Sequence, residues 1–117
     1  MSPSVLIVDD HPTFRATARA LLEAEGFEIV GEAEDGRAAI EAARRLRPEV
    51  VLLDVQLPDI DGFEVAASLT SNGNSPAVVL ISSRDAADFG ELIALSGARG
   101  FLAKAELSGA ALTALLR

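Results

Sequence analysis

The chain has 117 residues, a formal net charge of −8 and no cysteine, and 50% of its residues are hydrophobic. These values predict one folded domain over residues 1–117 and exclude disulfides, thiolate metal sites and a disordered tail. The negative charge argues against binding of a nucleic-acid backbone through this domain. The longest apolar run, residues 77–81, is too short to cross a membrane, and no basic segment precedes it. We therefore expect a cytoplasmic domain without membrane contact.

Five short runs of β-type residues recur along the chain at spacings of 22 to 27 residues. They begin near Val5, Phe27, Val50, Ala77 and Gly100. The segments between them repeat apolar residues at helical spacing. These faces contain Phe14, Ala18, Leu21 and Leu22, then Ile40, Ala43 and Leu46, then Val65, Ala66 and Leu69, and finally Leu112, Leu115 and Leu116. Alternation of this kind predicts an α/β fold with a parallel sheet, whereas the pattern of a leucine-rich solenoid is missing.

The strands differ in their pattern, and this difference predicts their order. Residues 5–8, 50–53 and 77–81 are continuously apolar, which is typical of strands buried on both faces. Residues 27–29 alternate and residues 100–103 form a short run, so both suit sheet edges. The result is a flavodoxin-like (βα)5 doubly wound parallel sheet with strand order 2-1-3-4-5. Ligands of such sheets bind beyond the carboxyl ends of the first and third strands.

Polar residues follow the strands at this edge of the sheet. They are Asp9 and Asp10 after the first strand, Asp54 after the third, Ser82 and Ser83 after the fourth, and Lys104 after the fifth. Three crowded carboxylates repel one another unless a cation compensates, and oxygen ligands favour Mg²⁺. Lys104, the only lysine in the chain, can approach the same point.

Helix capping is the competing interpretation of these polar residues. Asp and Ser commonly cap helices, and Pro12 fits a helix start shortly after Asp10, which can itself cap that helix. Asp35 and Asp61 are expected to cap the second and third helices. Three arginines near the end of the second helix are interpreted as a solvated patch that complements the helix dipole. These are Arg44, Arg45 and Arg47.

Three segments carry a resemblance to a known family. They are residues 5–12 (VLIVDDHP), 52–62 (LLDVQLPDIDG) and 97–104 (GARGFLAK). In this order and spacing the chain resembles, over essentially its whole length, the receiver domain of bacterial two-component response regulators. The resemblance implies a signalling domain that catalyses only its own Mg²⁺-dependent phosphotransfer and dephosphorylation. It implies a sensor histidine kinase as partner, and we also expect a homodimer on phosphorylation.

The resemblance also implies a role for each matching residue. Asp54 would accept the phosphoryl group, Asp9, Asp10, Asp54 and the Gln56 backbone carbonyl would hold Mg²⁺, and Ser82 and Lys104 would bind phosphoryl oxygens. Phe101 matches the aromatic residue that swings inward when Ser82 is drawn to the phosphate, which would alter the face formed by the fourth helix, fifth strand and fifth helix. Gln56, Ser83 and Arg84 would modulate phosphate lifetime. His11 is interpreted as a residue at the start of the first helix, beside the metal site.

Some features depart from the family pattern or leave alternatives open. Ala105 stands where many receivers have a cis proline. The segments resemble receivers joined to a helix-turn-helix output domain, so we expect the receiver part of a longer transcription regulator, with a stand-alone phosphorelay receiver as the alternative. An aspartate-nucleophile phosphatase would need an acid where Gln56 stands. A flavin- or nucleotide-binding module would need a loop rich in Gly, Ser or Thr where Asp9 and Asp10 stand. A degenerate receiver that signals without phosphate is disfavoured by the intact set of five site residues.

Overall fold

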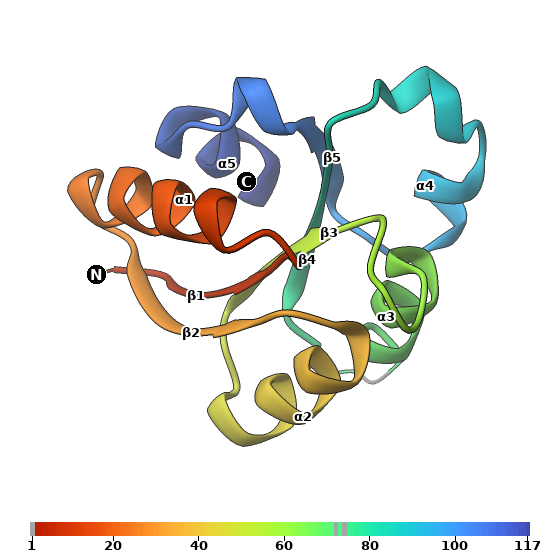
Figure 1. Cartoon of the computed structure of the whole chain (residues 1–117), viewed down its shortest axis with the longest axis horizontal. Coiled ribbons are helices and arrows are strands. Elements are labelled where there is room, and N and C mark those ends of the chain that lie inside the picture. Colours follow the sequence, from red (N-terminus) through yellow and green to blue (C-terminus); the bar gives the residue numbers. More distant parts are fainter. Residues whose placement is uncertain (1, 72, 74) are drawn as a thin grey trace.

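The computed structural model describes residues 2–71, 73 and 75–117 of the chain. Five parallel strands form one sheet in the order β2-β1-β3-β4-β5, as the sequence predicts (Figure 1). The strands are β1 (Ser4–Val8), β2 (Glu28–Ala33), β3 (Val50–Asp54), β4 (Ala77–Ser82) and β5 (Gly100–Ala103). The edge positions of β2 and β5 confirm the distinction drawn from their sequence patterns.

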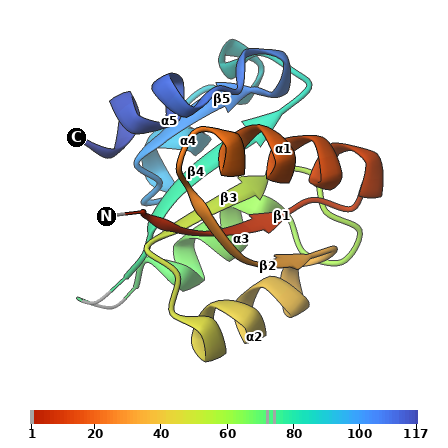
Figure 2. The same cartoon turned by 90° about the vertical axis from the view of Figure 1, so that its left-hand side faces the viewer.

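Helices cover both faces of this sheet. They are α1 (Pro12–Ala24), α2 (Gly36–Leu46), α3 (Gly62–Leu69), α4 (Leu92–Leu95) and α5 (Gly109–Leu116), with 3-10 turns η1 (Ala86–Phe89) and η2 (Lys104–Glu106). Figure 2 shows α1 and α5 on one side of the sheet and α2 and α3 on the other. Among the described residues, no helix is long and apolar enough to cross a bilayer.

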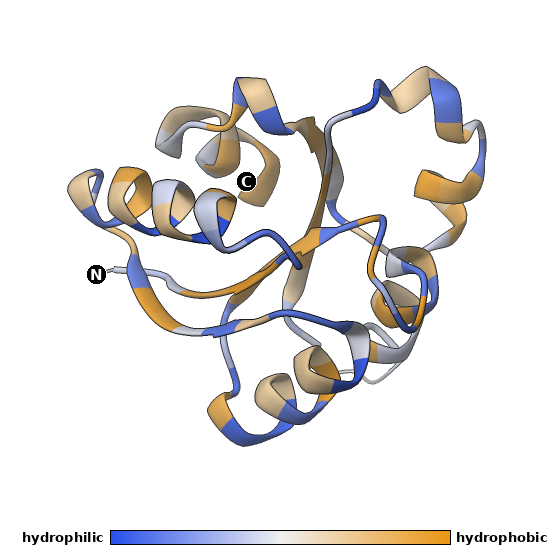
Figure 3. Cartoon of the chain, viewed as in Figure 1, coloured by the Kyte–Doolittle hydropathy of each residue, from blue (hydrophilic) through white to orange (hydrophobic). Residues whose placement is uncertain are grey.

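The central strands bury side chains on both faces because successive residues point to opposite sides. In β1, Leu6 and Val8 pack in the core beneath α2 and α3, whereas Val5 and Ile7 pack in the core beneath α1 and α5. Figure 3 shows β1 apolar along its length and hydrophilic just beyond its end. The apolar runs therefore supply two cores, and their ends deliver polar residues to one edge.

Caps position the helices that begin near this edge. The Asp35 side chain accepts a hydrogen bond from the Ala38 N–H at 2.8 Å, and Asp61 accepts one from Glu64 N–H at 3.0 Å, which confirms both predicted caps. The suggestion that Asp10 caps α1 is wrong. His11 occupies the N-cap position in an extended conformation, so the Asp10 side chain lies one residue too early to act as the cap.

The segment between β4 and β5, residues 83–99, contains only a single turn of α-helix. Gly90 has φ of 56° and Gly97 has φ of 83°, and these left-handed conformations break the helical path around α4. Residues 83–88 are all exposed, and Phe89 is the first residue after β4 that is partly buried. The fourth helix of this fold is therefore much shorter than α1 or α2. We call residues 83–99 the β4–β5 segment.

Candidate functional site

Two buried carboxylates and the only lysine meet at the carboxyl edge of the sheet. Asp9 follows β1 and is 0% exposed, and Asp54 ends the neighbouring strand β3 and is 3% exposed. Lys104, just after β5, places its Nζ 2.6 Å from Asp9 Oδ2 and 3.2 Å from Asp54 Oδ2. The structure therefore brings together residues from three strand ends, and two of them, Asp9 and Lys104, are 95 positions apart in the sequence.

The two oxygens of Asp9 have different partners. Oδ1 accepts a hydrogen bond from the His11 backbone N–H at 2.7 Å and lies 3.0 Å from His11 Nδ1. Oδ2 forms the buried ion pair with Lys104, and no further donor among the described residues reaches this oxygen. Lys104 is thus the sole described partner of this buried oxygen.

Asp54 is held by one backbone and one side-chain donor. Its Oδ1 accepts a hydrogen bond from the Gln56 backbone N–H at 3.1 Å, and its Oδ2 accepts one from Lys104. Burial raises the pKa of Asp54, and the charge of Asp9 adds to that rise, while the Gln56 N–H and Lys104 act in the opposite direction. The net result is a raised pKa, so the ionised form of Asp54 is electrostatically strained.

Lys104 responds to the same surroundings in a consistent way. Burial alone would lower the pKa of its ammonium group, but the contact with Asp9 and the charges of Asp54 and Asp9 outweigh burial and raise it. Its Nζ also lies 4.7 Å from the centre of the Phe14 ring on α1, within the range of a cation–π interaction. Lys104 is therefore a fixed positive charge between two acids.

Oxygen and nitrogen donors at this point can hold a metal ion. One donor atom each from Asp9, Asp10, His11 and Asp54 lies within 4.8 Å of the others. Three of the four donors are carboxylates, which suits a hard ion such as Mg²⁺. The residues present therefore fit the metal that the sequence predicted.

Ser82 lies on β4 and Phe101 on the neighbouring edge strand β5. The end of β4 carries Ser82, which is buried and pairs in register with Ala103, the residue before Lys104. Its Oγ accepts a hydrogen bond from the Arg84 backbone N–H at 3.0 Å. Phe101 in β5 is partly buried. Ser83 and the Arg84 side chain are exposed on the loop that follows.

Comparison with known proteins places these features in a family. The family model for the response regulator receiver domain matches residues 5–117. The chain belongs to this receiver family.

Relatives of this receiver domain include transcription regulators. It is 43% identical over 102 residues to a putative transcriptional regulator of Pseudomonas aeruginosa, which covers 87% of the chain and 49% of the relative. It is 41% identical to the regulator BvgA of Bordetella pertussis, over 91% of the chain and 51% of BvgA. The chain thus spans about half the length of the curated relatives it matches.

A solved receiver domain shows the same fold. The signal receiver domain of the putative response regulator NarL from Mycobacterium tuberculosis superimposes with a TM-score of 0.85 at 38% identity. The match covers 98% of this chain and 97% of that one. The (βα)5 order predicted from the sequence is therefore the fold of this family.

An aromatic cluster joins the β4–β5 segment to the receiver core. The Phe89 ring lies 5.8 Å from Phe101 and 5.5 Å from Phe63 on α3, and the Arg84 guanidinium lies 5.5 Å from the Phe89 ring centre. Sequence reasoning missed Phe89. The available signal was an isolated aromatic residue in the otherwise polar stretch 83–91.

Asp59 is a second residue of the site region that sequence reasoning missed. Its carboxylate accepts hydrogen bonds from the N–H groups of Gly36 at 2.7 Å and Arg37 at 3.0 Å, at the start of α2. Burial would raise the pKa of Asp59, but these backbone donors outweigh burial and lower it. Asp59 therefore ties the loop after β3, which carries Gln56, to α2 and fixes its path.

Gly62 lets α3 begin close against the end of β3. A Cβ at this position would collide with the Asp54 backbone oxygen and lie 2.7 Å from the Val55 Cα. The Gly62 N–H donates to the Val55 carbonyl at 2.7 Å. The Asp-Gly pair at 61–62 thus provides both a helix cap and the close approach that positions Asp54.

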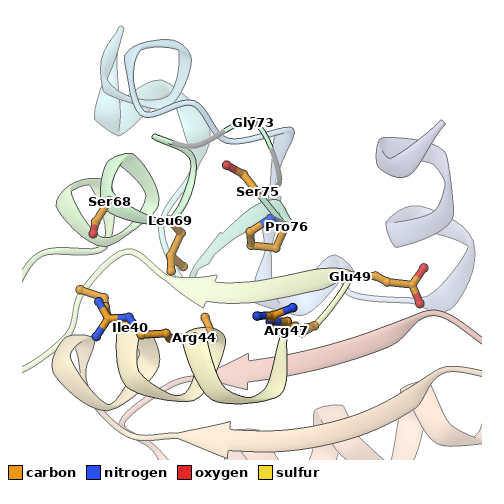
Figure 4. Close-up of a pocket in the computed structure, with 11 residues that line it drawn as sticks. Ile40, Arg44, Arg47, Glu49, Ser68, Leu69, Gly73, Ser75 and Pro76 are labelled. Carbon is orange, nitrogen blue, oxygen red and sulfur yellow. The ribbon is translucent and has the colours of Figure 1, made fainter.

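A cavity of the receiver lies at the opposite edge of the sheet (Figure 4). It has a volume of about 750 Å³ and lies beside the amino ends of β3 and β4. Its lining includes Ile40, Arg44 and Arg47 from the end of α2, with Ser68 and Leu69 from α3. None of the predicted site residues lines it, so this cavity is separate from the group formed by Asp9, Asp10, Asp54 and Lys104, which we call the acidic edge.

Proposed function

We propose that this receiver domain is a phosphorylation-dependent signalling switch in which Asp54 accepts a phosphoryl group from a sensor histidine kinase. The observation that carries the proposal is the meeting of Asp9, Asp54 and Lys104 at the switch point of the sheet. A buried carboxylate with a raised pKa and a neighbouring ammonium is a nucleophile beside a charge that can neutralise phosphoryl oxygens.

The chemistry is a simple exchange of bonds at phosphorus. An Asp54 carboxylate oxygen forms a bond to phosphorus as the bond between phosphorus and the donor imidazole nitrogen breaks, and the nitrogen keeps that electron pair. Lys104 and the Ser82 hydroxyl bind phosphoryl oxygens of the resulting acyl phosphate. A Mg²⁺ ion held by Asp9, Asp10, Asp54 and the Gln56 backbone carbonyl would reduce the repulsion between an anionic donor and an anionic acceptor.

The signal passes from the phosphate to the β4–β5 segment. Ser82 Oγ accepts the Arg84 N–H, and Arg84 lies over Phe89, which contacts Phe101. When Ser82 is drawn toward a phosphoryl group, the Arg84 backbone N–H loses its acceptor. This change shifts an existing equilibrium between two conformations of the β4–β5 segment and Phe101. The lifetime of the acyl phosphate is modulated by the side chains that surround it, those of Gln56, Ser83 and Arg84.

The output follows from the relatives of the chain. Because those relatives are transcription regulators about twice as long, we assign this receiver to transcription control through a separate output domain. The alternative is a stand-alone phosphorelay receiver. In either case the domain acts in the cytoplasm, forms a homodimer on phosphorylation and does not itself bind nucleic acid or membrane. It catalyses only its own phosphotransfer and dephosphorylation.

Phosphorylation with a small donor tests the proposal. With Mg²⁺ and acetyl phosphate, intact-mass measurement should show one added phosphoryl group that is stable in acid and labile in base. Chelator or Asp54→Asn should abolish it, whereas Asp85→Asn should keep it, because Asp85 is an exposed acid outside the cluster. Label at the wild-type level in Asp54→Asn would refute the assignment, and turnover of small phosphate esters would favour a phosphatase instead.

A further inference from the structure

The His11 side chain places an imidazole nitrogen at the acidic edge and does not cap the helix that follows it. It is the N-cap residue of α1, yet its side chain makes no capping hydrogen bond. Its Nδ1 instead lies 3.0 Å from Asp9 Oδ1 and 3.1 Å from Asp10 Oδ1, with the ring 67% exposed. The nitrogen therefore lies between two carboxylates, on a ring that is mostly exposed.

These distances match adjacent corners of a metal coordination shell. With metal–ligand bonds of about 2.1 Å, two ligands at a right angle are about 3.0 Å apart. A second observation concerns the other donors. One donor atom each from Asp9, Asp10, His11 and Asp54 lies within 4.8 Å of the others. The cluster thus contains three carboxylates and one imidazole nitrogen that a cation can join.

The type of donor decides which cation gains from it. Mg²⁺ prefers oxygen ligands, so an imidazole adds little to its binding. Neutral imidazole is a good ligand for Zn²⁺ and neighbouring transition ions, whose affinity for mixed nitrogen and oxygen sites is higher. His11 should therefore affect these two classes of ion very differently.

We propose that His11 Nδ1 is a ligand in this site for borderline transition ions, with Zn²⁺ as the representative, and that the receiver binds Zn²⁺ through Asp9, Asp10 and His11 as well as Asp54. This inference rests on the proposed function, because it uses the carboxylates assigned to Mg²⁺. Mg²⁺ uses the oxygen ligands alone, and His11 then keeps its contact with Asp9.

Affinity measurements on tag-free protein test the inference. Titration calorimetry at one fixed pH gives the dissociation constants for Zn²⁺ and Mg²⁺ in wild type and in His11→Ala. Loss of even a residue that only supports a metal ligand weakens metal binding 10–100-fold, so loss of a ligand should weaken Zn²⁺ binding by about tenfold or more. Mg²⁺ binding should change by less than about twofold, within the context-dependence of an exposed contact.

His11→Gln is the control for a purely hydrogen-bonding role. Glutamine can donate to Asp9 but offers no imidazole nitrogen. If His11 is a ligand, this variant should lose Zn²⁺ affinity as His11→Ala does. Recovery of wild-type Zn²⁺ affinity in His11→Gln, or equal weakening of both ions in His11→Ala, would overturn the inference.

Nitrogen NMR gives a second readout that does not depend on affinity. His11 is the only histidine in the chain, so every imidazole ¹⁵N signal belongs to it. Saturation with Zn²⁺ should shift the Nδ1 signal strongly, whereas saturation with Mg²⁺ should leave it nearly unchanged. An unshifted Nδ1 at Zn²⁺ saturation would refute coordination by His11. Failure of Mg²⁺ to bind at all would instead refute the proposed function, so the two failures are distinguishable.

Discussion

The acidic edge and the β4–β5 segment, which begins directly after Ser82, are built in opposite ways. At the edge, Asp9 and Asp54 are buried and each accepts a hydrogen bond from the backbone of the loop that follows it. In residues 83–91 every side chain except Phe89 is exposed. The two carboxylates are thus held at the ends of buried strands. The β4–β5 segment, which we expect to respond to phosphorylation, has few buried contacts that would oppose a change of conformation.

The difference also appears in charge. At the edge, the Lys104 ammonium lies within 3.2 Å of carboxylate oxygens of two buried acids. The ion pair of Arg84 with Asp88 in the β4–β5 segment is instead exposed, at 3.3 Å. A buried cluster responds strongly to the loss of one charge, and an exposed pair responds little. Five changes follow from this contrast, from the largest expected effect to the smallest.

Removal of the lysine should have the largest effect. Lys104→Met leaves Asp9 and Asp54 buried without their cation, and removing one partner of a buried ion pair costs about 3 kcal/mol or more. Urea unfolding of metal-free protein at neutral pH measures this loss. Arg45→Met is the matched control, because Arg45 is exposed and has no ion pair in the described part of the chain. It should stay within about 0.5 kcal/mol of wild type.

A phosphate mimic should affect the two regions unequally. Beryllofluoride with Mg²⁺ should change amide hydrogen exchange in residues 84–107 by about tenfold, equivalent to about 1.4 kcal/mol, and by much less in α2. Mass-spectrometric exchange with and without the mimic measures both. An equal change in α2, or no change outside the loops that hold the acids, would reject coupling through Ser82 and Phe101.

Neutralising Asp54 should stabilise the domain in chelator. Its raised pKa shows that the ionised form is disfavoured, so Asp54→Asn relieves strain while Lys104 keeps its contact with Asp9. We expect a gain of about 1 kcal/mol, which is about 4 °C in the thermal midpoint for a domain of this size. Mg²⁺ should narrow the gap, since wild type binds the ion more tightly. A lower midpoint than wild type would contradict the strained cluster.

The same strain predicts how the gap depends on pH. Because folding raises the pKa of Asp54, the folded state binds this proton more readily than the unfolded state does, and wild type gains stability as pH falls toward that raised pKa. Asp54→Asn has no such gain. The midpoint difference between the two metal-free proteins should therefore shrink as pH is lowered from neutrality. Acids that do not interact with Asp54 or Lys104 contribute equally to both proteins and cancel in this comparison.

Asp10→Asn should have the smallest effect. Asp10 is exposed and does not cap α1, so little stability depends on its side chain. Relief of repulsion in chelator should raise the free energy of unfolding by about a few tenths of a kcal/mol. The thermal midpoint should therefore rise by less than it does in Asp54→Asn. Melting both variants side by side measures the ratio. A gain in Asp10→Asn equal to that in Asp54→Asn would show that burial is not the source of the strain.

The sequence predicted those parts of the molecule that depend on local pattern. Continuous apolar runs marked the central strands, and the residue after each run marked the edge where Asp9, Asp54 and Lys104 meet. The caps at Asp35 and Asp61 were also local signals, because each side chain accepts a hydrogen bond from an N–H group three residues later. The roles of the site residues themselves stay predictions that the proposed experiments test.

Features that depend on contacts between distant segments were not predicted. Asp59 binds α2 across 23 positions of sequence, and no local pattern announces that contact. Phe89 acquires its role only because Phe63 and Phe101 arrive from other elements. The error at Asp10 has a different cause, since one residue of backbone geometry decides whether Asp10 or His11 is the cap. The break beside α4 was not predicted either, because it depends on the positive φ of Gly90, which is visible only in the structure.

The position of Phe89 also suits a fluorescent probe of the domain. The chain has no tryptophan and no tyrosine, so its near-ultraviolet emission is almost dark. An indole introduced by Phe89→Trp would be the only strong fluorophore, placed between Phe63 and Phe101. The wavelength of its emission maximum would report how far water reaches the indole at this position. Stopped-flow measurement of this wavelength would give the rate at which the β4–β5 segment responds.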